Sequence, residues 1–65
     1  MRILVNGAWH DIDAGDVAAC LAELGYQAAC VATAVNGEFV PVGQRTARPL
    51  VDGDRLEVLA PMQGG

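Results

Sequence analysis

Two Asn-Gly pairs, Asn6-Gly7 and Asn36-Gly37, constrain the fold of this 65-residue chain more than any other feature. Asn-Gly is the dipeptide best suited to the positive φ angles of a two-residue turn between antiparallel strands. Each pair lies between short runs of apolar and β-branched residues, which favour strands. The sequence therefore predicts two β-hairpins. Their strands are expected at residues 2–5, 8–12, 30–35 and 38–40.

Between the hairpins, an apolar pattern indicates one short helix. The apolar residues from Val17 to Leu24 recur at the spacing of a single helical stripe. Asp16 can cap the first turn by accepting hydrogen bonds from free backbone N–H groups, and Gly25 can end the helix in a left-handed conformation. A helix of about nine residues is too short to persist alone. We therefore expect it to pack on a sheet.

The remainder of the chain predicts a loop over 41–49, a turn at 52–54 and a last strand over 55–60. The order strand, strand, helix, strand, strand, strand predicts an α+β fold of the β-grasp (ubiquitin-like) type. A mixed sheet of four to five strands would carry one helix across it, and a right-handed crossover would place the last strand beside the first. We expect residues 1–60 to form this domain. Residues 61–65 are expected to form a flexible C-terminal tail ending in Gly-Gly.

The net charge of −4 and the small size narrow the classes of function. The four basic residues are scattered, whereas a nucleic-acid partner requires a basic stripe. The sequence has neither an apolar run as long as a membrane span nor a signal segment, which predicts a cytoplasmic protein without a membrane partner. One minimal core has little room for an enclosed active site. We therefore expect no catalytic residue and no bound cofactor, and look for function on the surface or at a terminus.

The cysteines and the single histidine form no catalytic or metal-binding pattern. Cys20 and Cys30 lack CxxC spacing and a second ligand pair, so we expect buried free thiols, with a disulfide as the alternative. His10 is expected to face solvent, because no carboxylate and nucleophile accompany it as in a triad. Asp52 and Asp54 flank Gly53, where turn formation is favoured over metal binding.

The C-terminal tail carries the candidate site. Gly64 and Gly65 lack the Cβ atoms that would block a narrow channel. A carboxylate is a poor electrophile, but attack of the Gly65 carboxylate on the α-phosphate of ATP would give an acyl-adenylate that a sulfur nucleophile can convert to a thiocarboxylate. Gly65 is therefore the predicted reactive residue, Gly64 gives it access, and Met62 and Gln63 are possible partner contacts. The alternative is an inert, frayed terminus.

Three motifs resemble the ThiS sulfur carriers of thiamine biosynthesis: the run Val-Asn-Gly-Glu-Phe-Val-Pro over 35–41, Asp-Gly-Asp over 52–54, and the closing Gly64-Gly65. The resemblance covers essentially the full length. It implies that a ThiF-type enzyme adenylates Gly65 with ATP, that a cysteine persulfide supplies sulfur, and that the thiazole synthase ThiG accepts it. Many such carriers have a basic residue after the Val-Pro pair, whereas Val42 stands here. Arg45 is the candidate substitute for that charge.

Two other functions share the predicted fold and the first chemical step. One is a MoaD-type sulfur carrier for molybdopterin synthesis, which differs only in the sulfur acceptor. The other is a ubiquitin-like protein modifier, whose adenylate passes through an enzyme thiol to a lysine amine. A plain interaction module with an inert tail is a further alternative.

Overall fold

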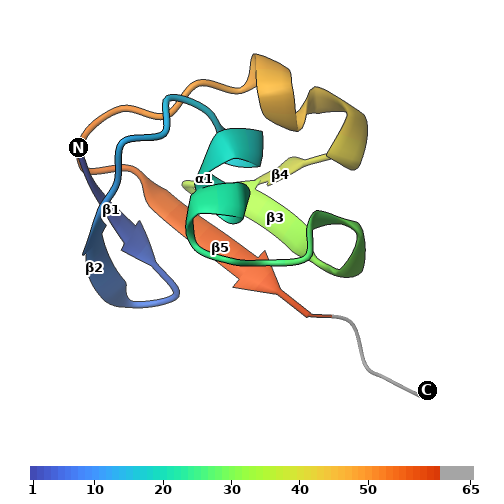
Figure 1. The fold of residues 1–65 in the computed structure, drawn as a ribbon, viewed down its shortest axis with the longest axis horizontal. Helices are drawn as coiled ribbons and strands as arrows, with labels where there is room; N and C mark the ends of the chain where they lie inside the picture. The colour runs from blue at the N-terminus through green and yellow to red at the C-terminus, as the bar shows by residue number, and fades with distance from the viewer. Residues whose placement is uncertain (61–65) are drawn as a thin grey trace.

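A computed structural model describes residues 1–60, which fold around a five-stranded mixed sheet (Figure 1). The strands are β1 (Arg2–Val5), β2 (Ala8–Asp11), β3 (Ala32–Val35), β4 (Glu38–Val40) and β5 (Arg55–Leu59). Their order in the sheet is β2-β1-β5-β3-β4, and β5 runs parallel to β1 and antiparallel to β3. The last strand therefore lies beside the first, and the β-grasp prediction is confirmed.

Both predicted hairpins are present, and each is closed by its Asn-Gly pair. The φ angles are 48° at Asn6 and 85° at Gly7, and 51° at Asn36 and 85° at Gly37. Positive φ at both central residues defines the tight turn whose twist matches that of antiparallel strands. The two hairpins thus have the same local geometry at opposite edges of the sheet.

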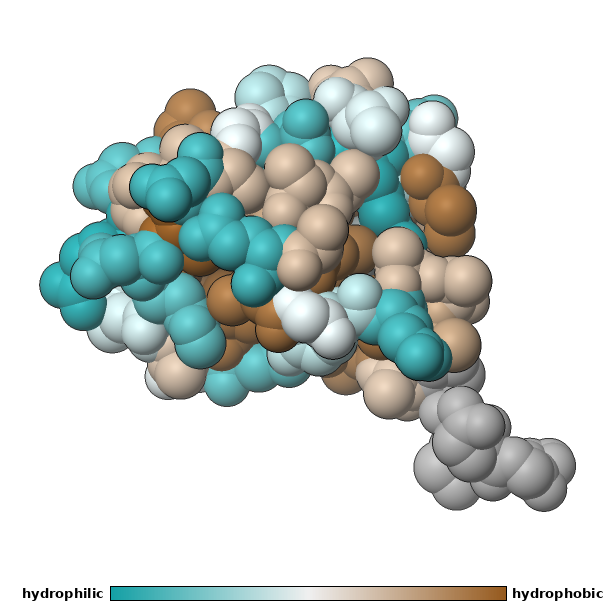
Figure 2. Space-filling model, viewed as in Figure 1, coloured by the Kyte–Doolittle hydropathy of each residue, from teal (hydrophilic) through white to brown (hydrophobic). Residues whose placement is uncertain are grey.

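The helix α1 (Val17–Glu23) lies across one face of the sheet and is slightly shorter than predicted (Figure 1). The Asp16 carboxylate caps it by accepting a 2.8 Å hydrogen bond from the backbone N–H of Ala19. On the helix-bearing side, hydrophilic and hydrophobic residues are interspersed at the surface (Figure 2). The core between helix and sheet comprises buried residues from β1, β3, β4, β5 and α1 and from the connecting segments: Ile3, Val5, Ile12, Ala14, Val17, Cys20, Leu21, Val35, Val40, Leu50, Leu56 and Val58.

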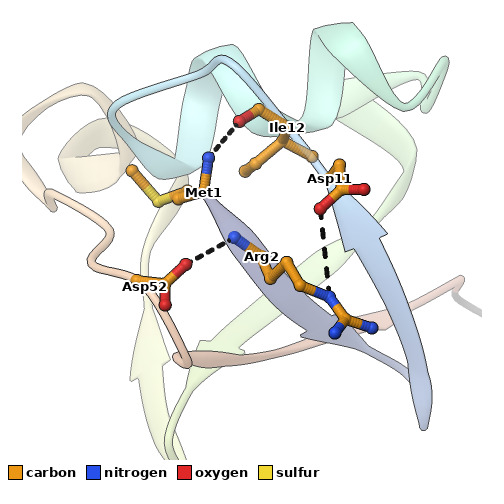
Figure 3. Close-up of polar contacts among 5 residues, drawn as sticks. All are labelled: Met1, Arg2, Asp11, Ile12 and Asp52. Carbon is orange, nitrogen blue, oxygen red and sulfur yellow. Dashed lines mark hydrogen bonds and ion pairs between the residues drawn. The ribbon is translucent and has the colours of Figure 1, made fainter.

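The backbone N–H groups at the N-terminus of the chain bond to two different segments (Figure 3). The Met1 nitrogen donates to the carbonyl oxygen of Ile12 at 2.8 Å, which extends the first hairpin beyond β2. The Arg2 N–H donates to the Asp52 carboxylate at 2.7 Å. The predicted turn at Asp52 and Gly53 is also present, closed by a 3.0 Å hydrogen bond from the Asp54 N–H to the Val51 carbonyl oxygen. The Arg2–Asp11 ion pair, 3.9 Å long and exposed, contributes little to stability.

Strands β2 and β5 each end one residue earlier than predicted, and the largest error in a strand boundary is at the start of β3. Cys30 was expected to begin a strand, but it ends a short 3-10 helix, η1 (Ala28–Cys30), and β3 starts only at Ala32. The physical reason is a long-range contact, because the Arg45 guanidinium binds the carbonyl oxygens of Ala28 and Val31. Arg45 belongs to a second 3-10 helix, η2 (Val42–Ala47), within the segment predicted as a loop.

Arg45 is a buried cation that joins three segments. Its side chain is 3% exposed and donates to Ala28 O at 2.7 Å, to Val31 O, and to the Thr33 hydroxyl at 3.3 Å. The Thr33 hydroxyl in turn donates to Val40 O at 3.0 Å. A buried charge is tolerated only when its hydrogen bonds are made, and here they tie η2 to η1 and to the edge of the sheet.

We expect Arg45→Met to lower the free energy of unfolding by about 2–4 kcal/mol, because the carbonyl groups of Ala28 and Val31 and the buried hydroxyl of Thr33 lose their shared donor. The matched control is Arg55→Met, since the Arg55 side chain is exposed and makes no hydrogen bond within the described residues. That control should change stability by about 0.5 kcal/mol or less. Urea denaturation of both variants provides the comparison, and equal small losses would contradict the anchoring role of Arg45.

Candidate functional site

The predicted reactive group lies outside the described residues. Met62, Gln63, Gly64 and Gly65 all belong to this segment, so their assignment stays a prediction, as does the division of the chain at residue 60. What the structure does define is the point from which the tail departs. The chain leaves the sheet at Leu59, the last residue of β5, and Ala60 follows. Because β5 is the middle strand of the five, this exit point has two strands of the sheet on either side of it.

The end of β5 is held on both sides. On one side, Ala32 of β3 is paired with Leu59 in the antiparallel ladder. On the other side, the side-chain amide of Asn6 makes two hydrogen bonds to the backbone of Val58, at 2.8 and 2.9 Å. The last described residues before the tail are therefore attached to a well-paired strand.

An apolar surface adjoins this exit point on the sheet face opposite α1. Phe39 and Leu59 are large apolar residues that remain 67% and 66% exposed. The ladders place Phe39 opposite Ala34, and Leu59 opposite Ala32. These four residues, named here the outer-face patch, line an open hollow together with Thr33 and Glu57. Exposed aromatic and aliphatic residues gathered around a hollow are typical of protein contact surfaces.

Along β5, the residues before Leu59 that lie on the same face are the charged residues Arg55 and Glu57, and they form the boundary of the outer-face patch. Beyond them Trp9 is 51% exposed on β2, and the Arg2 guanidinium lies 5.1 Å from the centre of its ring. Trp9 is thus an exposed residue in a cation–π contact and is not part of the core. The sequence alternation of β5 could have identified Leu59 as outward-facing, because Leu56 and Val58 face the core.

The remaining candidate side chains lie apart from one another. Cys20 is a buried free thiol, as predicted, but the prediction of burial is wrong for Cys30, which is free and exposed on η1. Burial raises the pKa of the Cys20 thiol, and the nearby carboxylates of Glu23 and Asp16 raise it further. This thiol is therefore poorly suited to act as a nucleophile. His10 is exposed on β2, as expected.

Asp52 and Asp54 act as turn residues. The Asp54 carboxylate accepts hydrogen bonds from the Val51 N–H at 2.9 Å and from the Asn36 amide at 3.0 Å. Within residues 1–60, no three His, Cys, Asp or Glu side chains are grouped so that they could hold a metal ion. None of the helices in this part of the chain is both long and apolar enough to cross a membrane.

The expectation that Arg45 supplies a surface charge near the second hairpin is wrong. Its guanidinium is buried and bound to carbonyl oxygens, as described above. Any partner that approaches this region meets Val42 instead, which is 65% exposed. Sequence reasoning missed this because the acceptors of Arg45 are 12 to 17 positions away along the chain.

Comparison with known proteins agrees with the fold and with the motifs. Residues 3–65 match the model of the ThiS family. The crystal structure of a thiamine biosynthesis protein (ThiS) from Geobacter metallireducens superimposes with a TM-score of 0.85 and 33% sequence identity, covering 100% of both chains. A solution structure of a thiamine biosynthesis protein from the same organism gives a TM-score of 0.78 at 33% identity, covering 100% of this chain and 88% of the other. A search of curated protein sequences finds no match.

Proposed function

This chain belongs to the ThiS family, the sulfur carriers of thiamine biosynthesis, and from that membership we propose that its working group is the Gly65 carboxylate. The observation that carries the proposal is the extent of the family match. The match runs to residue 65 and so includes the Gly64-Gly65 pair. A second observation supports it, because the middle strand of the sheet leads directly into the segment that ends with this pair.

The proposed chemistry begins with adenylation. A Gly65 carboxylate oxygen attacks the α-phosphorus of ATP, pyrophosphate leaves, and an acyl-adenylate forms. The terminal sulfur of a cysteine persulfide then attacks the acyl carbon, and AMP leaves with the electron pair of its bond. A thiol cleaves the sulfur–sulfur bond of the resulting acyl persulfide, and that reduction leaves the thiocarboxylate on Gly65. The thiocarboxylate sulfur is the nucleophile that is finally delivered to the acceptor.

The catalytic groups for these steps belong to partner proteins. We assign adenylation to a ThiF-type enzyme that binds ATP, sulfur supply to a persulfide donor, and sulfur acceptance to the thiazole synthase ThiG. The carrier contributes a carboxylate that fits a narrow channel, because Gly64 and Gly65 present no side chains. Chain ends of this kind offer few contacts, so binding energy must come from elsewhere on the carrier.

The outer-face patch is the surface proposed to supply that energy. Leu59 belongs both to the patch and to the end of β5, so a partner that covers the patch is placed next to the emerging tail. The net charge of −4 further favours a partner whose docking surface is basic around an apolar centre. We commit to the adenylating enzyme as the occupant of this surface, because it is the partner that must guide an unmodified carboxylate to ATP.

Deleting Gly65, or adding one bulky residue after it, should abolish adenylation. Deletion shortens the reach by about 3.3–3.6 Å, and near-attack geometry tolerates an error of only about 1 Å. ATP–pyrophosphate exchange with the ThiF-type enzyme measures the first step, and mass spectrometry detects the replacement of one oxygen by sulfur. Thermal melts should match the parent for both variants. Conversion of either variant at the parent's rate would show that the reactive carboxylate is not at Gly65.

Phe39→Ala should raise the KM of the adenylating enzyme for the carrier by about tenfold, because large aromatic residues at the centre of an interface dominate its binding energy. Val51→Ala is the matched control. Val51 is also a large exposed apolar residue, at 62%, but it precedes β5 at the end away from the tail. Equal KM values for the two variants would show that the outer-face patch does not contact the enzyme.

A further inference from the structure

The pairing between β1 and β5 stops before β5 does. In the parallel ladder, Leu4 is opposite Arg55 and Val5 is opposite Leu56. The Leu4 N–H donates to Asp54 O at 3.0 Å and the Asn6 N–H donates to Leu56 O at 3.1 Å. At Asn6 the φ angle of 48° turns the backbone into the hairpin. From this point on, β5 has no strand backbone beside it on the β1 side.

The side chain of Asn6 takes the place of the missing strand. The Val58 N–H donates to Asn6 Oδ1 at 2.8 Å, and Asn6 Nδ2 donates to Val58 O at 2.9 Å. In a parallel ladder that continued, these same Val58 groups would bond to the main-chain carbonyl of position 6 and to the N–H of position 8. The Asn6 amide therefore acts as a substitute peptide group and extends the pairing of β5 as far as Val58.

The second hairpin provides an internal comparison. Asn36 occupies the same position of the same type of turn, with φ 51°. Its amide also makes two hydrogen bonds, but at the start of β5: the Arg55 N–H donates to Asn36 Oδ1 at 3.0 Å, and Asn36 Nδ2 donates to the Asp54 carboxylate at 3.0 Å. The two asparagines thus hold opposite ends of the middle strand, and only Asn6 is next to the residues that lead into the tail.

We propose that Asn6 is a positioning residue for the proposed adenylation of Gly65: by holding Val58, it fixes the direction in which the chain leaves the sheet. This inference rests on the proposed function. Without the Asn6 amide, the backbone N–H and C=O of Val58 would lose their partners on the β1 side, and the end of β5 would be held only by its pairing with β3, where Leu59 lies opposite Ala32. The body of the carrier would still dock on its partner, but the carboxylate would reach the α-phosphate in fewer of the docked complexes.

The test compares Asn6→Gly with Asn36→Gly. Glycine adopts positive φ readily, so both turns are retained, and each variant loses two hydrogen bonds. We expect similar losses of thermal stability. In ATP–pyrophosphate exchange with the ThiF-type enzyme, Asn6→Gly should lower kcat by about tenfold or more with KM within about twofold of the parent. Asn36→Gly should leave kcat unchanged.

The split between kcat and KM separates positioning from simple destabilisation. Partial unfolding removes usable substrate and so raises the apparent KM, whereas a misdirected tail lowers kcat in the docked complex. Backbone NMR order parameters of Leu59 and Ala60 give a second readout, which should fall in Asn6→Gly and not in Asn36→Gly.

Each outcome has one meaning. Lower order parameters with an unchanged kcat would overturn the positioning role while leaving the proposed function intact. Equal kcat losses in the two variants, or a loss confined to KM, would also overturn it. If the parent protein itself were not adenylated, the proposed function would fall, and the role of Asn6 in that reaction with it.

Discussion

The insertion of β5 between β1 and β3 is the interaction on which the rest of the molecule depends. It joins two hairpins that are distant in sequence into one sheet, and it places Leu56 and Val58 in the same buried core as the apolar residues of α1. Neither hairpin alone has enough apolar surface for independent stability. The same strand carries the chain out of the domain at Leu59. The pairing that completes the fold is therefore also the pairing that sets where the tail begins.

Local signals were sufficient to predict the five strands and the α-helix of this fold, although not its two 3-10 helices. The two Asn-Gly turns, the cap at Asp16 and the apolar stripe of α1 act within a few residues, and a right-handed crossover then leaves one place for the last strand. The errors have a different cause. Cys30 was predicted to lie in a strand, whereas it ends the 3-10 helix that the Arg45 guanidinium contacts through the carbonyl of Ala28. That contact joins residues 17 positions apart, and nothing in the neighbouring sequence indicates that Arg45 is buried.

The residues of the candidate site also differ in whether the sequence alone could identify them. The Gly64-Gly65 pair could be recognised from the sequence, because the chemistry belongs to the residues themselves. The outer-face patch required the strand register, which brings Phe39 and Leu59 onto one face with Ala34 and Ala32. The contact between the Asn6 side chain and β5 could not be predicted from the sequence either. The turn explains an asparagine at this position, but only the structure shows its amide on Val58.

The central claim is that Gly65 carries sulfur in the cell, and the intact mass of the chain isolated from the cells that produce it tests this most directly. A sulfur carrier predicts a population in which one oxygen of the C-terminal carboxylate is replaced by sulfur, and this population should disappear when the ThiF-type enzyme is deleted. A protein modifier would instead be recovered linked through Gly65 to lysine side chains of other proteins. A chain found only with an unmodified carboxylate, in cells that are making thiamine, would contradict the account.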